Sequence, residues 1–237
     1  MVESRRSPYP LVHQISFSKN TERYKPKRNS TRLIEQFGIN NYRLWELGNT
    51  RDFIRKNYSG EVLLAFDKLK PFSYKADLAR YCIVNFYGGL YADLSVNNVH
   101  IFDTKDFDMV LFRDMNSDRT SWKVATSFFY SAPQSTILND SIAQCVENCK
   151  LRYYGKDPHF PTGPNVLGRA VAKFGPDLNI LVGQYHWFHR RKNRYVLPGN
   201  RIVARHKIGG AFLGGQSGIL GGNNYNEMWN NRDIYEQ

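Results

Sequence analysis

Three charged side chains stand among apolar neighbours, at spacings that could bring them to one site. Asp77 and Arg80 are three residues apart in a predicted helix, so they share one of its faces. Asp93 follows an apolar run that predicts a buried strand, where a lone carboxylate is costly unless a cation or several donors satisfy it. Arginine offers a charged fork of donors to a phosphate or a sugar, and a carboxylate accepts hydrogen bonds from hydroxyl groups. We expect the three side chains to face a common pocket.

The helical pair also has simpler explanations. Asp77 and Arg80 could form a salt bridge on the helix surface, where such pairs contribute little to stability. Asp77 could also hold Arg80 in place rather than touch a ligand. Asp93 has no comparable explanation, because a buried carboxylate needs a partner.

The elements that carry these residues follow from hydrophobic periodicity. A helix is predicted over Tyr74–Tyr87, with Ser73 as its cap and Gly88-Gly89 as its end. The next segment, Leu90–Val96, is apolar almost without interruption up to Asp93 and predicts a buried strand. A polar group at the end of such a strand opens onto a crevice.

The rest of the chain alternates between predicted strands and helices. Strands are expected at Leu11–Phe17, Tyr42–Leu47, Met109–Arg113, Val124–Tyr130, Ile180–Trp187 and Arg194–Arg205. Helices are expected after an Asn49 or Thr50 cap, at Glu61–Leu69, at Thr136–Lys150 after a Ser135 cap, and from the 162–165 segment to Phe174, while Lys19–Ser30 is predicted to be a loop. This alternation predicts one α/β domain over residues 1–237, ending in a glycine-rich lid or tail over about 206–237.

The charge of the chain predicts an anionic partner. Its net charge is +12; six of its cations gather in residues 19–32, and seven lie in residues 190–207, where there is no acid. Such a field attracts nucleic acid, an anionic membrane surface or a nucleotide diphosphate, and charge alone does not choose between them. A solvated basic face without any partner is a further alternative.

Apolar runs and cysteines predict a cytoplasmic protein. No stretch approaches the roughly 20 consecutive apolar residues of a membrane-spanning helix, and residues 1–10 are polar and basic, unlike a signal peptide. The three cysteines, Cys82, Cys145 and Cys149, form no CxxC pair, and an odd number argues against a disulfide framework.

Several motifs resemble one known family. Residues 75–81 and 87–95 resemble the core signature of glycosyltransferase family 32, the DXD sugar transferases, a pattern that also occurs in the large clostridial glucosylating toxins. Residues 43–45, 53–58 and 10–15 resemble the family's upstream elements, and Thr162-Gly163-Pro164 matches its TGP element. The resemblance covers about residues 10–170.

The resemblance implies a fold, a reaction and a set of site residues. The fold would be a GT-A type, Rossmann-like α/β/α sandwich, and the reaction would be transfer of a hexose from a nucleotide-diphosphate sugar, with retention of configuration. Asp93 stands in the place of the first DXD aspartate, with Arg80 and Asp77 as the other implied catalytic residues. The residues expected to bind the UDP- or GDP-hexose donor are His13, Gln14, Asp77, Arg80, Tyr91, Asp93 and Asn165, although His13 could equally be a packing residue.

The sequence departs from the family at Ser95, which stands where the second DXD aspartate, usually a direct metal ligand, is expected. The resemblance implies Mn²⁺ or Mg²⁺ bridging the diphosphate, with Asp93, Ser95 and His206 as candidate ligands. A serine hydroxyl is a weak neutral ligand. Three interpretations follow: a modified metal site, a metal-independent enzyme in which arginine and lysine neutralise the diphosphate, or a relative that has lost activity.

Acceptor and location are expectations of the same kind. A glycan or lipid-linked acceptor is expected, as in capsular polysaccharide or lipopolysaccharide synthesis, with the basic surface holding the protein at the inner face of an anionic membrane. The alternative from another class is a basic nucleic-acid-binding protein, for which no recognisable motif is present. That alternative gives no reason for Asp77, Arg80 and Asp93 to converge.

Overall fold

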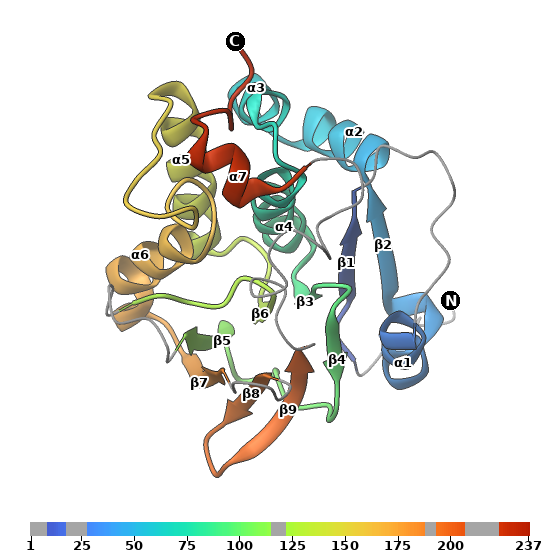
Figure 1. Cartoon of the computed structure of the whole chain (residues 1–237). Helices are drawn as coiled ribbons and strands as arrows, with labels where there is room; N and C mark the ends of the chain where they lie inside the picture. Colours follow the sequence, from blue (N-terminus) through green and yellow to red (C-terminus); the bar gives the residue numbers. More distant parts are fainter. Residues whose placement is uncertain (1–8, 18–27, 115–121, 188–192, 207–222) are drawn as a thin grey trace.

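The described strands form one nine-stranded mixed sheet (Figure 1). The computed structural model describes residues 9–17, 28–114, 122–187, 193–206 and 223–237. The strands are β1 (Val12–Ser16), β2 (Tyr42–Glu46), β3 (Gly89–Ala92), β4 (Val96–Asn98), β5 (Met109–Asp114), β6 (Phe128–Ser131), β7 (Ile180–His186), β8 (Asn193–Leu197) and β9 (Arg201–His206). Their order in the sheet is β2-β1-β3-β6-β5-β7-β8-β9-β4.

Helices connect and cover these strands. They are α1 (Arg28–Phe37), α2 (Leu47–Asn57), α3 (Gly60–Lys68), α4 (Phe72–Tyr87), α5 (Thr136–Lys150), α6 (Pro164–Phe174) and α7 (Tyr225–Asn230), with short 3₁₀ helices at Ile39–Asn41 and Gly175–Asp177. No helix within the described ranges has the length and apolar character needed to cross a bilayer.

Strand direction divides the sheet into two parts. β1 runs parallel to β2 and β3, and β5 runs parallel to β7, while β6 lies antiparallel between β3 and β5. From β7 onward the neighbours β8, β9 and β4 are all antiparallel. β3 and β4 are only a turn apart in the chain but lie six places apart in the sheet order, so the intervening turn leads from the middle of the sheet to its edge.

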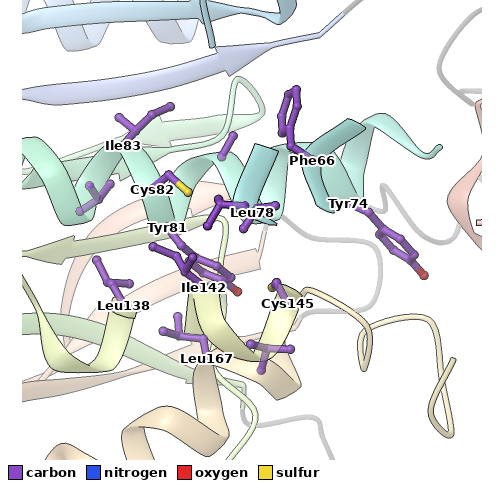
Figure 2. Close-up of a cluster of buried hydrophobic side chains, with 14 of the residues drawn as sticks. Phe66, Tyr74, Leu78, Tyr81, Cys82, Ile83, Leu138, Ile142, Cys145 and Leu167 are labelled. Atoms are coloured by element: carbon purple, nitrogen blue, oxygen red, sulfur yellow. The ribbon is translucent and has the colours of Figure 1, made fainter. Parts of the chain in front are cut away.

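The larger core lies between one sheet face and helices α2 to α6. Figure 2 shows its centre, where α4 places Leu78, Tyr81 and Cys82 beside Leu138 and Ile142 of α5. All of these side chains are buried, because α4 lies in the middle of the core and is buried continuously from Asp77 to Asn85. α4, which carries Asp77 and Arg80, is thereby fixed in the middle of the domain.

A second core covers the opposite sheet face. Leu33 and Phe37 of α1 pack there with residues of the central strands and of the β8–β9 hairpin, among them Val12, Leu90 and Tyr195. Helices therefore lie on both faces of the sheet, as an α/β/α arrangement requires. Figure 1 shows α1 apart from the helices gathered above the sheet, beside β2 and β4.

The end of α4 and the start of β3 follow the prediction closely. Gly88 has φ 65° and caps α4, a conformation that favours glycine, and β3 begins at the next residue. The predicted Leu90–Val96 strand is wrong in its second half: β3 ends at Ala92, a turn occupies 93–95, and Val96 already belongs to β4. The polar residues Asp93 and Ser95 lie in that turn.

Several predicted boundaries are wrong for identifiable reasons. α4 begins at Phe72 with Pro71 as its cap, so Ser73 lies inside the first turn. α2 begins at Leu47, and Asn49 is its third residue, forming a capping box with Glu46. Arg28 to Ser30, predicted as loop, form the first turn of α1, a helix that the sequence reading missed.

Two of the later strands were predicted with wrong ends or without a turn that interrupts them. The predicted 124–130 strand pairs regularly only from Phe128, while Val124 makes a single bridge to Arg113. The predicted 194–205 strand is a hairpin, β8 and β9. Helix α5 and its Ser135 cap are confirmed, since the Ser135 hydroxyl accepts the Leu138 N–H at 3.4 Å.

The three cysteines lie in the larger core of the domain. Cys82, Cys145 and Cys149 are buried free thiols, which agrees with the absence of a disulfide framework. The tail returns to the domain through α7 and a bridge between Tyr235 and Leu69. Of the predicted lid or tail over about 206–237, the glycine-rich part, residues 209–222, lies outside the described residues.

A pair of helical glycines tests the packing of α6. A Cβ atom at Gly168 in α6 would overlap the carbonyl oxygen of Trp122, whereas one at Gly48 in α2 would meet nothing within 4 Å. Gly168→Ala is expected to destabilise the protein by about 2 kcal/mol or more, since overpacking of this kind typically costs about 1–3 kcal/mol. Gly48→Ala is expected to stabilise it by roughly 0.5–1 kcal/mol through helix propensity. Urea unfolding midpoints would measure both, and equal midpoints would contradict the packing described.

Candidate functional site

A cleft of about 530 Å³ opens where the N-terminal ends of α1 and α4 meet the turn after β3. Its polar lining comprises Arg28, Asn29, Ser73, Arg80, Asp93 and Ser95. Ile15, Phe17 and Phe72 contribute an apolar wall, in which the two phenylalanine rings meet edge to face. This combination of an apolar wall and a few convergent polar groups is typical of a small-molecule site.

Arg80 is the most constrained polar group of the cleft. Its side chain is 7% exposed, and it donates hydrogen bonds to the carbonyl oxygens of Ala76 at 3.1 Å and Thr126 at 2.8 Å. The guanidinium carbon lies 4.6 Å from the centre of the Tyr91 ring, and Nη2 lies 3.5 Å from Oδ1 of Asp93. Burial by itself disfavours the charge, but Tyr91 and the carboxylates of Asp93 and Asp77 outweigh burial and raise the pKa of Arg80. Arg80 is therefore a permanently charged, fixed cation.

Asp93 faces the cleft from the turn after β3. Its Oδ1 accepts a hydrogen bond from the Tyr91 hydroxyl at 2.7 Å, and its side chain is 30% exposed. Its backbone N–H donates to Ser127 O at 2.8 Å, and its carbonyl accepts from the Gln14 amide at 3.3 Å. The Tyr42 hydroxyl in turn donates to Gln14 at 2.9 Å. The carboxylate thus lies just past the strand end, but the expectation that it is buried is wrong, because it is partly exposed and has Tyr91 and Arg80 as partners within the protein.

Asp77 lies behind Arg80 and is not among the residues that line the cleft. Its Oδ1 is 3.4 Å from Nη1 of Arg80, and its Oδ2 accepts the Thr162 hydroxyl at 2.9 Å. Burial raises the pKa of Asp77, while Arg80 and the Thr162 hydrogen bond oppose that rise. Because the pair is buried, the alternative of a surface salt bridge is wrong. Asp77 has the geometry of a group that holds Arg80 in place.

The TGP segment is joined to the same network from the other side. The Tyr81 hydroxyl donates to the carbonyl oxygens of Thr162 at 3.0 Å and Gly163 at 3.2 Å. Asn165, expected to contact the donor, is buried in the first turn of α6 and does not line the cleft. The structure therefore connects this segment to Asp77 rather than to the cleft.

His13 is a packing residue, one of the two roles that the sequence left open. It is fully buried in β1 and does not line the cleft. The Trp45 indole N–H donates to its Nδ1 at 3.2 Å, and its Nε2 donates to the Gly88 carbonyl at 3.0 Å. Burial, assisted by nearby Arg43 and opposed by the Gly88 hydrogen bond, lowers its pKa to about 4. Both ring nitrogens are engaged, so the expected contact with a nucleotide is not supported.

The structure brings together Ser95 and His206, two of the three candidate metal ligands. Ser95 Oγ lies 2.6 Å from Nε2 of His206, and the Tyr185 hydroxyl lies 2.8 Å from its Nδ1. The Asn193 amide donates to that hydroxyl at 2.9 Å. Within the described ranges, no group of three His, Cys, Asp or Glu side chains could hold a metal ion. One paired carboxylate, a hydroxyl and an imidazole bonded at both nitrogens do not fit the oxygen-rich shell of Mg²⁺ or Mn²⁺.

The sequence reading missed two residues at the N-terminus of α1. Arg28 and Asn29 line the cleft, and the Asn29 amide donates to the carbonyl oxygen of Leu94 at 3.1 Å. The helix itself was missed, because a run of cations and asparagines predicts loop. The cation cluster of residues 19–32 was the only signal that pointed toward Arg28.

Comparisons with known proteins support the resemblance seen in the motifs. Residues 27–123 match the family model described as a glycosyltransferase sugar-binding region containing a DXD motif, which confirms the family resemblance. A relative, an uncharacterized glycosyltransferase of Acanthamoeba polyphaga mimivirus, is 32% identical over 90 residues. That match covers 36% of this chain and 35% of the relative, so the chain spans about a third of the length of the relative that it matches.

A solved structure supports the fold. The PaToxG glycosyltransferase is similar with a TM-score of 0.52 at 14% sequence identity, covering 71% of this chain and 70% of that one. This likeness confirms the expected GT-A type α/β fold. A glycosyltransferase involved in glycosylation of the major capsid of PBCV-1 is similar with a TM-score of only 0.35 at 12% identity, over 74% of this chain and 82% of that one, and carries no weight.

The buried His13 predicts a pH dependence of stability. Its pKa is about 4 in the folded protein against 6.5 ordinarily, so between these values the unfolded chain takes up a proton that the folded protein does not. The free energy of unfolding should therefore fall as the pH is lowered from about 6.5 to about 4, with a contribution of about 3 kcal/mol from this group. His13→Gln should remove that contribution, which urea unfolding across this pH range would measure. The same replacement at exposed His100 is the control, and parallel curves for wild type and His13→Gln would contradict the prediction.

Proposed function

From the match of residues 27–123 to the glycosyltransferase sugar-binding region family, we propose that this chain transfers a hexose from a nucleotide-diphosphate sugar to a glycan acceptor. The observation that carries the proposal is the buried Arg80, held between Tyr91 and Asp93 at the wall of the cleft. A fixed guanidinium in a cleft is suited to a phosphate, and a carboxylate beside it to ribose or sugar hydroxyls.

The chemistry assigned to these residues is electrostatic. When the bond between the sugar and the diphosphate breaks, its electron pair stays on the departing phosphate oxygen, where negative charge builds up. Arg80 is positioned in advance and loses no side-chain freedom at that moment, so it can stabilise this charge. Asp93 is held by the Gln14 and Ser127 contacts, which supports a role in orienting the donor. Asp77 supports Arg80 from behind.

The finer assignments rest on the family resemblance. It supports UDP- or GDP-hexose as donor, retention of configuration, and a glycan or lipid-linked acceptor in capsular polysaccharide, lipopolysaccharide or other surface glycan synthesis. The match to the DXD region also implies a possible divalent cation, Mn²⁺ or Mg²⁺. The net charge of +12 supports peripheral contact with an anionic membrane.

The carboxylate of Asp93 provides the test. Donor sugars of UDP and GDP would be screened for release of the nucleoside diphosphate, first with water and then with glycan acceptors. Asp93→Asn should lower turnover of the accepted donor by about 100-fold or more, the size of effect seen when one preorganised electrostatic group is removed. Asp106→Asn, which makes the same change at an exposed carboxylate, should leave turnover unchanged.

Two results would contradict the proposal. If Asp93→Asn turned over the donor within about threefold of wild type, the site would be wrongly placed. If no nucleotide sugar were bound or turned over, while single-stranded oligonucleotides bound in a salt-dependent manner, the basic surface would instead serve nucleic acid.

A further inference from the structure

We infer that the cleft binds the nucleotide diphosphate with guanidinium charge in place of a divalent cation, and that Ser95, His206 and Tyr185 form a hydrogen-bonded chain where a second metal-binding carboxylate would be needed. The inference rests on the proposed function, since it concerns how the same cleft holds its donor. The family resemblance implies a divalent cation at this site. The inference departs from that expectation because of the charged and polar side chains that line the cleft.

The described side chains that line the cleft include more cations than anions. Among the described residues, the lining contains two cations, Arg28 and Arg80, and one anion, Asp93, while Asp77 lies behind Arg80 and outside the lining. Mg²⁺ and Mn²⁺ are bound through oxygen ligands, with carboxylates supplying the compensating charge. Asp93 Oδ1 already accepts the Tyr91 hydroxyl and faces the Arg80 guanidinium at 3.5 Å. A divalent cation there would be repelled by Arg80 and would gain only one carboxylate.

Among the described residues, the hydrogen-bonded chain from Ser95 to Tyr185 contributes no carboxylate. Ser95 is bonded to His206, and His206 is bonded in turn to Tyr185, so both imidazole nitrogens are engaged within the protein. A histidine binds a metal through a ring-nitrogen lone pair. Ligation by His206 would require one of these two hydrogen bonds to break. The sheet holds these hydrogen-bonded side chains in place, because His206 of β9 pairs with Val96 of β4, the residue after Ser95.

Donor groups for an anion converge on the opposite wall. Arg28 lies in the first turn of α1, a ten-residue helix whose positive end favours a bound anion. Asn29 fixes that helix end to the turn, through its bond to the Leu94 carbonyl. The Ser73 hydroxyl in the cleft lining is buried and has no hydrogen-bond partner within the described residues. Arg28 and Arg80 would balance the charge of a phosphate in the cleft.

Calorimetry with UDP and GDP tests the inference, in EDTA, in Mn²⁺ and in Mg²⁺. The wild-type protein should bind its preferred nucleotide in EDTA, and metal should leave the affinity unchanged within about twofold or weaken it. Arg28→Gln should weaken binding in EDTA by about tenfold, through loss of one charged contact.

Installing the second carboxylate gives a sharper test. Ser95→Asp should weaken binding in EDTA by about tenfold, because it adds negative charge beside the diphosphate, and Mn²⁺ should restore the affinity. Mn²⁺ binding without nucleotide, followed by electron paramagnetic resonance, should appear in Ser95→Asp and be absent from wild type. Ser59→Asp, the same change at the exposed cap of α3, controls for added charge and should behave as wild type.

The wild-type calorimetry tests the inference even if Ser95→Asp fails to fold, because it does not depend on that variant. Wild-type binding that requires Mn²⁺ or Mg²⁺, or is strengthened about tenfold by either, would overturn the inference and leave the proposed function intact. A Ser95→Asp variant that folds but acquires no Mn²⁺ dependence would also overturn it. Absence of nucleotide binding under every condition would remove the inference together with the proposed function.

Discussion

The site depends on one buried guanidinium. Arg80 joins three parts of the fold: its own helix α4, the strand end that carries Asp93, and the segment leading into β6, where Thr126 accepts its hydrogen bond. A buried charge is stable only when its partners remain in place, so these three parts hold one another in register. These contacts fix the Arg80 guanidinium at the cleft wall, and under the proposed function a fixed cation is suited to stabilising the departing diphosphate.

The turn between β3 and β4 is the second constraint. The chain leaves an interior strand of the sheet at Ala92 and enters the edge strand at Val96, and residues 93–95 between them line the cleft. Gln14 holds this turn from the sheet, and Asn29 holds it from α1. Asp93 and Ser95 are thereby positioned by backbone contacts from elements distant in the sequence, rather than by the preferences of the turn itself.

Local patterns in the chain predicted much of this arrangement. The spacing of Asp77 and Arg80 places them on one helical face wherever the helix lies, and the apolar run before Asp93 predicts a buried strand in most contexts. The glycines after α4 end that helix, and Ser135 caps α5. Both effects involve only neighbouring residues, so the sequence predicted them correctly. Boundaries were less predictable: α2 starts at Leu47 because Glu46 and Asn49 cap each other, a pairing that outweighed the expected cap.

Long-range contacts decided the remainder. His13 and Ser95 are both polar residues near strand ends, yet one is enclosed by Trp45 and the Gly88 carbonyl while the other faces the cleft beside His206, 111 residues away. The sequence pattern does not show which of the two residues is enclosed and which faces the cleft. That depends on where β1, β3, β4 and β9 lie in the sheet. The same assembly brings Arg28 to the cleft. Residue spacing thus supplied the charged groups and their local geometry, and the folded sheet determined which of them meet, because side chains far apart in sequence come together only through strand pairing.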